Sequence, residues 1–195
     1  ADTGGQVRYV LELARSLAEL DGIEQVDLFT RLIRDKRVSS DYSRTIEPLG
    51  PKRRIVRLSC GGGRYVRKER LWPFLDEFID RMIAFTQREG RKPTVVHGHY
   101  VDAGYIARHV ASVFGVPFIF SGHSLGRPKQ AYLRDKGTPD DVIEREYNMA
   151  RRIEEEENCL AEADLVITST NYERDVNYGM YRHGKTPRFE VLPPG

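Results

Sequence analysis

Apolar residues recur at helical spacing in several stretches of the chain. After the first glycines, Val7, Val10, Leu11 and Ala14 follow the three- and four-residue spacing of an amphipathic helix. Similar patterns come later, and one of them opens with Thr138-Pro139-Asp140-Asp141, a typical helix start. We therefore predict helices over residues 6–19, 71–88, 104–114, 138–161 and 170–178.

Short apolar runs alternate with these helices. They predict strands over residues 26–30, 54–58, 94–97, 116–120, 165–168 and 189–192, whereas residues 31–48 are predicted to be mostly loop. Strand, helix and strand in succession indicate an α/β fold, and near-continuous apolar strands indicate a sheet covered on both faces. We expect a Rossmann-like parallel sheet with helices on both faces, and the pattern marks no internal domain boundary.

Composition and charge exclude several classes of protein. With 195 residues, 39% apolar and 31% charged, the chain is long enough to bury a core and is not typical of disorder. The net charge of +2 gives no general attraction to nucleic acid or to an anionic membrane. No apolar run is long enough to cross a bilayer. Cys60 and Cys159 lie far apart outside any CxxC motif, which favours a reducing, cytoplasmic location.

Ligands of open α/β sheets bind beyond the carboxyl ends of the strands, so the polar residues that follow strands are the candidates. Near the start of the chain, Gly4, Gly5 and Gln6 precede a helix. Glycines let backbone N–H groups approach an oxyanion, and a helix N-terminus favours negative charge. A plain tight turn explains the same residues equally well, because the segment is neither GxGxxG nor a P-loop.

His97, His99 and Asp102 form a second candidate group. Histidines two apart on a strand share a face, and with Asp102 they offer nitrogen and oxygen ligands to a metal ion. The spacing misses the HxHxDH pattern of binuclear metallohydrolases by one residue. We favour the other interpretation, a pocket at the strand end in which Tyr100 and Asp102 supply hydrogen bonds.

Residues 121–129 form the third group. His123, Ser124, Arg127 and Lys129 follow a strand, and a hydroxyl with two cations suits a phosphorylated ligand. Gly122 to Gly126 also fits GxSxG, the nucleophile elbow of serine hydrolases. We disfavour that alternative, because an elbow leads directly into a helix and a polar stretch with Pro128 is predicted here instead.

Arg151 and Arg152 lie in a predicted helix beside a run of glutamates. The simplest interpretation is a solvated charged face with Arg151–Glu155 and Arg152–Glu156 pairs four residues apart.

Several of these segments together resemble the N-terminal half of sucrose-phosphate synthases, retaining glycosyltransferases of the two-domain GT-B fold. The matching segments occur in family order at residues 2–7, 67–75, 97–104, 121–126, 151–154 and 167–170. Sucrose synthases are similar at the first segment but differ around Tyr100 and Ser124. The resemblance implies an acceptor-binding Rossmann-like domain over residues 1–195, without the family's first strand and without the C-terminal donor domain.

The resemblance also implies roles for individual residues. Gly4, Gly5 and Gln6 would line the acceptor site and the donor diphosphate. The residues implied to hold fructose 6-phosphate are Lys68, Tyr100, Ser124, Lys129 and one of Arg151 and Arg152. His123 would hydrogen-bond the transferred hexose as the catalytic histidine. On this view the double arginine faces a phosphate rather than solvent.

The implied reaction transfers glucose from UDP-glucose to fructose 6-phosphate with retention, giving sucrose 6-phosphate. No carboxylate is placed as a nucleophile, so the protein would act by positioning and by charge stabilisation. No metal or cofactor is expected, and neither nucleic acid nor membrane is an expected partner. Without a donor domain, these residues alone would bind the donor poorly and turn over negligibly. Two alternatives stay open: a related enzyme with another donor such as GDP-mannose, and a non-catalytic sugar-phosphate-binding module.

Overall fold

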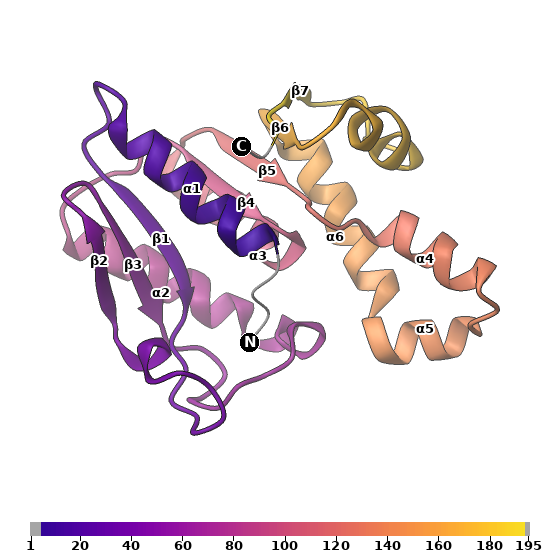
Figure 1. Cartoon of the computed structure of the whole chain (residues 1–195), viewed down its shortest axis with the longest axis horizontal. Helices are drawn as coiled ribbons and strands as arrows, with labels where there is room; N and C mark the ends of the chain where they lie inside the picture. Colours follow the sequence, from indigo (N-terminus) through magenta and orange to yellow (C-terminus); the bar gives the residue numbers. More distant parts are fainter. Residues whose placement is uncertain (1–4, 194–195) are drawn as a thin grey trace. The chain divides into compact units, whose positions relative to one another are not determined.

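The computed structural model describes residues 5–193 and divides the chain into two compact units, one ending at Phe85 and the other beginning at Thr86 (Figure 1). The division falls inside a helix, α2 (Leu75–Arg88). The first unit thus holds the predicted residues near the start of the chain and Lys68. The second unit holds every other predicted site residue.

A three-stranded sheet forms the centre of the first unit. Its strands are β1 (Val26–Arg31), β2 (Ile46–Gly50) and β3 (Arg53–Leu58), in the order β1-β3-β2. β1 and β3 are parallel, whereas β2 is antiparallel to β3, with a register shift between Pro48 and Gly50. Helix α1 (Gly5–Glu19) lies in front of this sheet in Figure 1 and α2 lies behind it. Phe29 on β1 packs edge-on against Phe85 on α2, with ring centroids 5.7 Å apart.

A buried arginine organises the loop that follows β3. Arg31 is 9% exposed, and its guanidinium donates hydrogen bonds to the carbonyl oxygens of Cys60, Gly61, Gly62 and Arg64, at 2.8 to 3.3 Å. Two short 3-10 helices come next, Lys68–Arg70 and Trp72–Phe74, before α2 begins. The loop that leads to Lys68 is therefore fixed by a side chain from β1.

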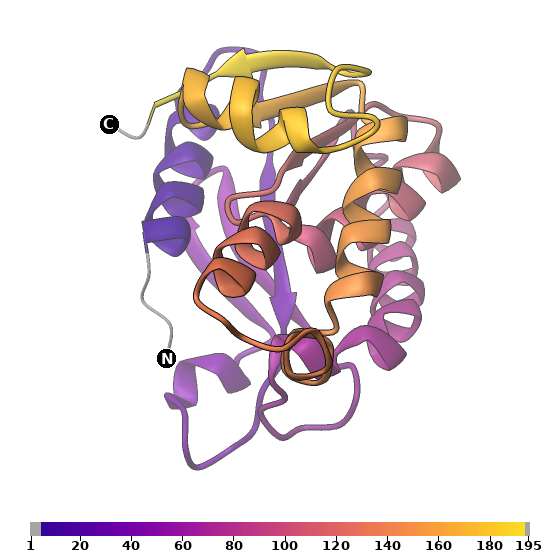
Figure 2. The same cartoon turned by 90° about the vertical axis from the view of Figure 1, so that its right-hand side faces the viewer.

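The second unit is built on a four-stranded parallel sheet. Its strands are β4 (Val96–His99), β5 (Phe118–Ser121), β6 (Leu165–Thr168) and β7 (Arg188–Val191), in the order β4-β5-β6-β7. The helices are α3 (Val101–Phe114), α4 (Gly126–Asp135), α5 (Asp140–Tyr147) and α6 (Met149–Glu162). α3 and α6 pack against the sheet, whereas α4 and α5 pack against α6 (Figure 2). A π-helical turn (Glu173–Asn177) and a 3-10 turn (Tyr178–Met180) connect β6 to β7.

Close packing of α3 depends on two glycines. A Cβ on Gly98 would lie 2.7 Å from the Ala103 carbonyl oxygen, and one on Gly104 would lie 2.7 Å from the Cys159 sulfur. The first turn of α3 therefore approaches β4 closely, which sets where Tyr100 leaves the strand. Cys60 and Cys159 are both buried and unpaired.

The α/β class predicted from the sequence is confirmed, with three corrections. The predicted loop at residues 31–48 contains the start of β2 and a 3-10 helix, Ser40–Ser43. The polar stretch after Ser124 is a helix, α4, because Pro128 stands in its first turn, where no intrahelical N–H donor is needed. The helix predicted over 138–161 is two helices, separated at Asn148 by a left-handed backbone with φ 48°. None of the helices in residues 5–193 combines the length and hydropathy required to span a bilayer.

Candidate functional site

Three strands of the second unit end beside the predicted site residues. Tyr100 directly follows β4, His123 and Ser124 follow β5 closely, and Thr170 follows β6. Since the strands are parallel, their carboxyl ends meet at one edge of the sheet, where α/β folds bind ligands. The structure thus brings together residues that lie up to 70 positions apart.

Two of these residues have backbone conformations that L-amino acids rarely adopt. Tyr100 has φ 78° and His123 has φ 55°, and only Asn148 shares a positive φ among the other non-glycine residues described. Such conformations cost about 1–3 kcal/mol each and persist where surrounding contacts enforce them. The Tyr100 N–H donates to the Ser121 carbonyl at 2.8 Å, and the Ser124 N–H donates to the Gly122 carbonyl at 2.6 Å. Backbone strain is therefore concentrated where β4 and β5 end.

Three histidines form a cluster at this edge. The rings of His97 and His99 lie 3.9 Å apart between centroids, on one face of β4 as their spacing predicts. The Nε2 atom of His97 lies 2.9 Å from the Ser121 hydroxyl, and Nδ1 of His99 lies 2.9 Å from Nε2 of His123. The ring plane of His123 is thus fixed by a neighbouring histidine.

The cluster is held in the neutral state. Burial, reinforced by the neighbouring histidines, lowers the pKa of His97 to about 4 and that of His99 to about 2. Burial alone lowers the pKa of His123 to about 4. At neutral pH the cluster therefore offers neutral imidazoles, which suit hydrogen bonds to hydroxyl groups better than ion pairing with a phosphate.

The structure gives no support to a metal site at these histidines. Across residues 5–193, His, Cys, Asp and Glu side chains form no group of three or more placed to hold a metal ion. Asp102, the third predicted ligand, accepts a hydrogen bond from the Ala103 N–H at 2.8 Å.

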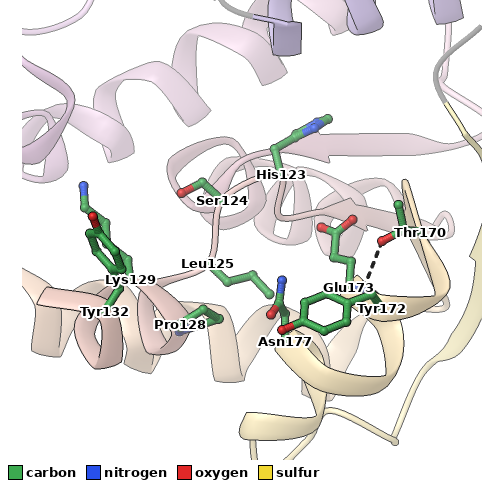
Figure 3. Close-up of a pocket in the computed structure, with 10 residues that line it drawn as sticks. All are labelled: His123, Ser124, Leu125, Pro128, Lys129, Tyr132, Thr170, Tyr172, Glu173 and Asn177. Atoms are coloured by element: carbon green, nitrogen blue, oxygen red, sulfur yellow. Dashed lines mark hydrogen bonds between the residues drawn. The ribbon is translucent and has the colours of Figure 1, made fainter. Parts of the chain in front are cut away.

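A pocket of about 480 Å³ opens beside the Ser124 turn (Figure 3). Three of the predicted residues, His123, Ser124 and Lys129, line it. The other lining residues are Leu125, Pro128, Tyr132, Thr170, Tyr172, Glu173 and Asn177. Figure 3 shows Ser124, Lys129 and Tyr132 on the side formed by α4, with Tyr172, Glu173 and Asn177 on the side formed by the segment after β6.

Lys129 brings a cation to this pocket from the first turns of α4. Its Nζ lies 3.9 Å from the centroid of the Tyr147 ring, on α5, a cation–π contact. Ser124 is exposed and Lys129 is half-buried, and both side chains line the pocket. A hydroxyl donor beside an ammonium group is suited to an oxyanion.

The two arginines of α6 occupy different environments. Arg151 is exposed, whereas Arg152 is 4% exposed and pairs with the fully buried Glu156, with Nε 3.0 Å from Oε1. The predicted Arg152–Glu156 pair is thus present but buried instead of solvated. The sequence predicted Arg151 as the partner of Glu155. In the structure Glu155 pairs with Arg108 on α3, whose Nε lies 2.6 Å from Glu155 Oε1.

The remaining predicted residues belong to the first unit. Gly4 lies outside the described residues. Gly5 and Gln6 are exposed in the first turn of α1, and Lys68 is exposed at the start of a 3-10 helix.

Sequence reasoning missed the far side of the pocket. Tyr172, Glu173 and Asn177 line it, and Tyr172 is 67% exposed although aromatic. These residues follow β6 within ten positions, so the strand-end rule that found Tyr100 and His123 would also have found them. Burial raises the pKa of the Glu173 carboxyl, which accepts a hydrogen bond from the Ser169 N–H at 2.8 Å.

Comparison with known proteins identifies the family. Residues 4–195 match the family described as "Glycosyl transferase 4-like domain". The chain belongs to this glycosyl transferase family. The match covers both compact units, so this glycosyl transferase 4-like domain includes the first unit as well as the pocket of the second.

Sucrose-phosphate synthases are similar to the domain along its whole length. It is 38% identical to sucrose-phosphate synthase 4 of Arabidopsis thaliana and 37% identical to the sucrose-phosphate synthase of Zea mays, covering 100% of this chain in both cases. It spans only 23% of the length of either relative. The resemblance seen in the sequence motifs is therefore confirmed.

Solved structures show the same fold. Two structures of a sucrose-phosphate synthase from Thermosynechococcus elongatus match the glycosyl transferase 4-like domain with TM-scores of 0.69 and 0.74, at 23% and 24% identity. The matches cover 96% and 97% of this chain, and 84% and 42% of the two solved chains. The α/β fold is thus that of a GT-B glycosyltransferase.

The prediction that no helix directly follows the Ser124 turn is wrong. α4 begins at Gly126, so the turn that bears Ser124 does lead directly into a helix. Other observations disfavour a hydrolase: the side-chain hydrogen bond of Ser124 is with Arg152 Nη2, at 3.4 Å, and no described histidine is bonded to the Ser124 hydroxyl. In this glycosyl transferase domain, Ser124 is better suited to bind a ligand than to attack one.

Proposed function

We propose that the protein transfers glucose from UDP-glucose to fructose 6-phosphate with retention, giving sucrose 6-phosphate, and that this domain binds the acceptor. The observation that carries the proposal is the pocket in which Ser124 and Lys129 lie together beside His123. The names of its sucrose-phosphate synthase relatives support the choice of substrates. The donor would be bound mainly by residues outside this chain, which spans under a quarter of those relatives.

The acceptor phosphate is assigned to the Ser124 turn. Ser124 donates a hydrogen bond from its hydroxyl, and Lys129 supplies a positive charge against the phosphate dianion. Of the two arginines, Arg151 is the phosphate ligand, because its side chain is exposed whereas Arg152 is buried against Glu156. Charge-assisted hydrogen bonds of this kind are about twice as strong as neutral ones.

The other predicted residues are assigned to the sugar and the donor. Tyr100 and Lys68 bind the acceptor, and Gly4, Gly5 and Gln6 line the acceptor and the donor diphosphate. His123 hydrogen-bonds the transferred hexose as a neutral imidazole, since burial lowers its pKa to about 4. In this scheme the protein acts by positioning the two sugars and by stabilising charge on the leaving diphosphate.

Calorimetric titration of the protein with fructose 6-phosphate and with fructose tests the proposal. Fructose 6-phosphate is expected to bind at least about tenfold more tightly, since a phosphate adds charge-assisted hydrogen bonds. Lys129→Ala should abolish this preference. Lys136→Ala is the matched control. Lys136 stands at the C-terminal end of the same helix, with its Nζ 5.7 Å from the centroid of the Tyr132 ring, and it does not line the pocket. Equal binding of the two sugars would contradict the proposal.

A further inference from the structure

A buried network lies beneath the Ser124 turn. Arg152 on α6 donates from Nη2 to the Ser124 carbonyl oxygen at 2.6 Å and lies 3.4 Å from the Ser124 hydroxyl. From Nε it donates to Glu156 Oε1 at 3.0 Å. One guanidinium therefore connects α6 to the backbone of the turn that carries Ser124.

The same guanidinium contacts a second residue of the site. Its Cζ lies 5.0 Å from the centroid of the Tyr100 ring. Tyr100 and His123 have positive φ angles, so the chain leaves β4 and β5 in strained conformations that need outside support. Arg152 touches Tyr100 directly and touches Ser124, the residue next to His123.

Glu156 connects this arginine to the start of α4. Its carboxylate accepts hydrogen bonds from the Gly126 N–H at 3.0 and 2.9 Å and from the Tyr181 hydroxyl. The Tyr181 hydroxyl in turn accepts from the Arg127 N–H at 2.9 Å. The first two N–H groups of α4 are thus bonded within the protein, so they are not the donors that receive a phosphate.

The approach of Glu156 to α4 depends on a glycine. A Cβ at Gly126 would lie 2.8 Å from Glu156 Oε2 and 2.8 Å from Ile153 Cγ1. Removing two charges from water costs several kcal/mol, and buried ion pairs are often replaceable by apolar side chains without loss of stability. Stability alone is therefore a weak reason for this arrangement, whereas its contacts with Ser124 and Tyr100 give it a definite geometric role.

We propose that Arg152 and Glu156 form a positioning pair that sets the geometry of Ser124 and Tyr100 for the acceptor phosphate, without touching the ligand. The inference rests on the proposed function and gives the two arginines different roles. Arg151 contacts the phosphate, whereas Arg152 fixes the conformation of the Ser124 turn. It also assigns Glu156, which the sequence predicted only as a member of a solvated ion pair, to the acceptor site.

Glu156→Gln separates this role from direct phosphate binding. If Arg152 bound the phosphate itself, removing its carboxylate partner would release the cation and affinity for fructose 6-phosphate would rise or stay the same. If the pair positions the turn, affinity falls by about fivefold to tenfold, the effect expected for weakening a charge-assisted hydrogen bond. Glu154→Gln is the matched control, since Glu154 is exposed on the same helix and makes the same change of charge.

The experiment is a calorimetric titration of parent, Glu156→Gln and Glu154→Gln proteins with fructose 6-phosphate and fructose, with a thermal melt of each. A parent that does not prefer fructose 6-phosphate overturns the proposed function and this inference with it. A parent that prefers it, with affinity unchanged or raised in Glu156→Gln, overturns this inference alone. If Glu156→Gln does not fold, Glu156→Asp gives the answer. The shorter carboxylate keeps the charge but cannot bond both Arg152 and the Gly126 N–H, so affinity must fall, and undiminished affinity overturns the inference.

Discussion

The Nδ1 atom of His99 lies 2.9 Å from the Nε2 atom of His123, so the histidine assigned to the transferred sugar is oriented by a histidine from the neighbouring strand. A hydrogen bond between two imidazoles uses one proton for two nitrogens. Protonating both rings would place two N–H groups against each other. The arrangement therefore excludes protonation of both rings at once, in agreement with their lowered pKa values.

Stability should fall as the pH is lowered from about 6.5 toward 4. The pKa values of His97 and His123 are lowered to about 4 in the folded state from an ordinary value of 6.5, so within this window the unfolded chain binds more protons. Each such histidine contributes a slope of up to about 1.4 kcal/mol per pH unit. Urea unfolding at pH 7, 6 and 5 measures the slope.

His97→Gln should reduce the slope of unfolding free energy against pH by the contribution of about one proton. A glutamine amide can replace the bond from His97 to the Ser121 hydroxyl, but it does not titrate. Comparison with the parent cancels the opposite contributions of Glu156 and Glu173, whose pKa values are raised by burial. An equal slope in parent and variant would show that His97 is not held neutral.

The positive φ of His123 should reverse the usual order of alanine and glycine. At φ 55° a side chain is strained, so His123→Gly is expected to be as stable as His123→Ala or more stable, by about 1 kcal/mol. The control is Ser112, exposed in α3, where alanine should be more stable than glycine by about 1 kcal/mol. Thermal unfolding of the four variants measures both differences, and the same order at both positions would refute a left-handed His123.

Replacing Arg31 should destabilise the first unit. Arg31→Met removes the donor to the carbonyl oxygens of Cys60, Gly62 and Arg64, and we expect the free energy of unfolding to fall by about 3 kcal/mol. Arg15→Met is the control, because Arg15 is exposed on α1 and its ion pair with Glu12 is a surface pair of small effect. Denaturant unfolding checks this, and similar midpoints for the two variants would contradict the role assigned to Arg31.

Much of the fold could be predicted from periodicity, and the failures have physical causes. β2 was missed because Pro48 interrupts its pattern, yet β2 is an edge strand, where proline is tolerated. α4 was missed because Gly126 and Pro128 resemble helix breakers, although both stand in the first turn. The break at Asn148 has little local signal, since apolar spacing continues on both sides of it.

The candidate site was predictable where strands end and not where distant residues converge. Tyr100 directly follows β4, and His123 and Ser124 lie within three residues of the end of β5. The spacing of Arg152 and Glu156 predicted their pairing, but their burial depends on Tyr181 and on Gly126, which come from other elements. Pairing with a distant tyrosine is a tertiary property that no local pattern encodes.

The most direct test is a crystal structure of the protein with fructose 6-phosphate. We predict the phosphate within hydrogen-bond distance of the Ser124 hydroxyl and Lys129 Nζ, with Arg151 turned toward it and Arg152 still bonded to Glu156 and to the Ser124 carbonyl. A phosphate bound away from the Ser124 turn, or bound directly by Arg152, would contradict this prediction.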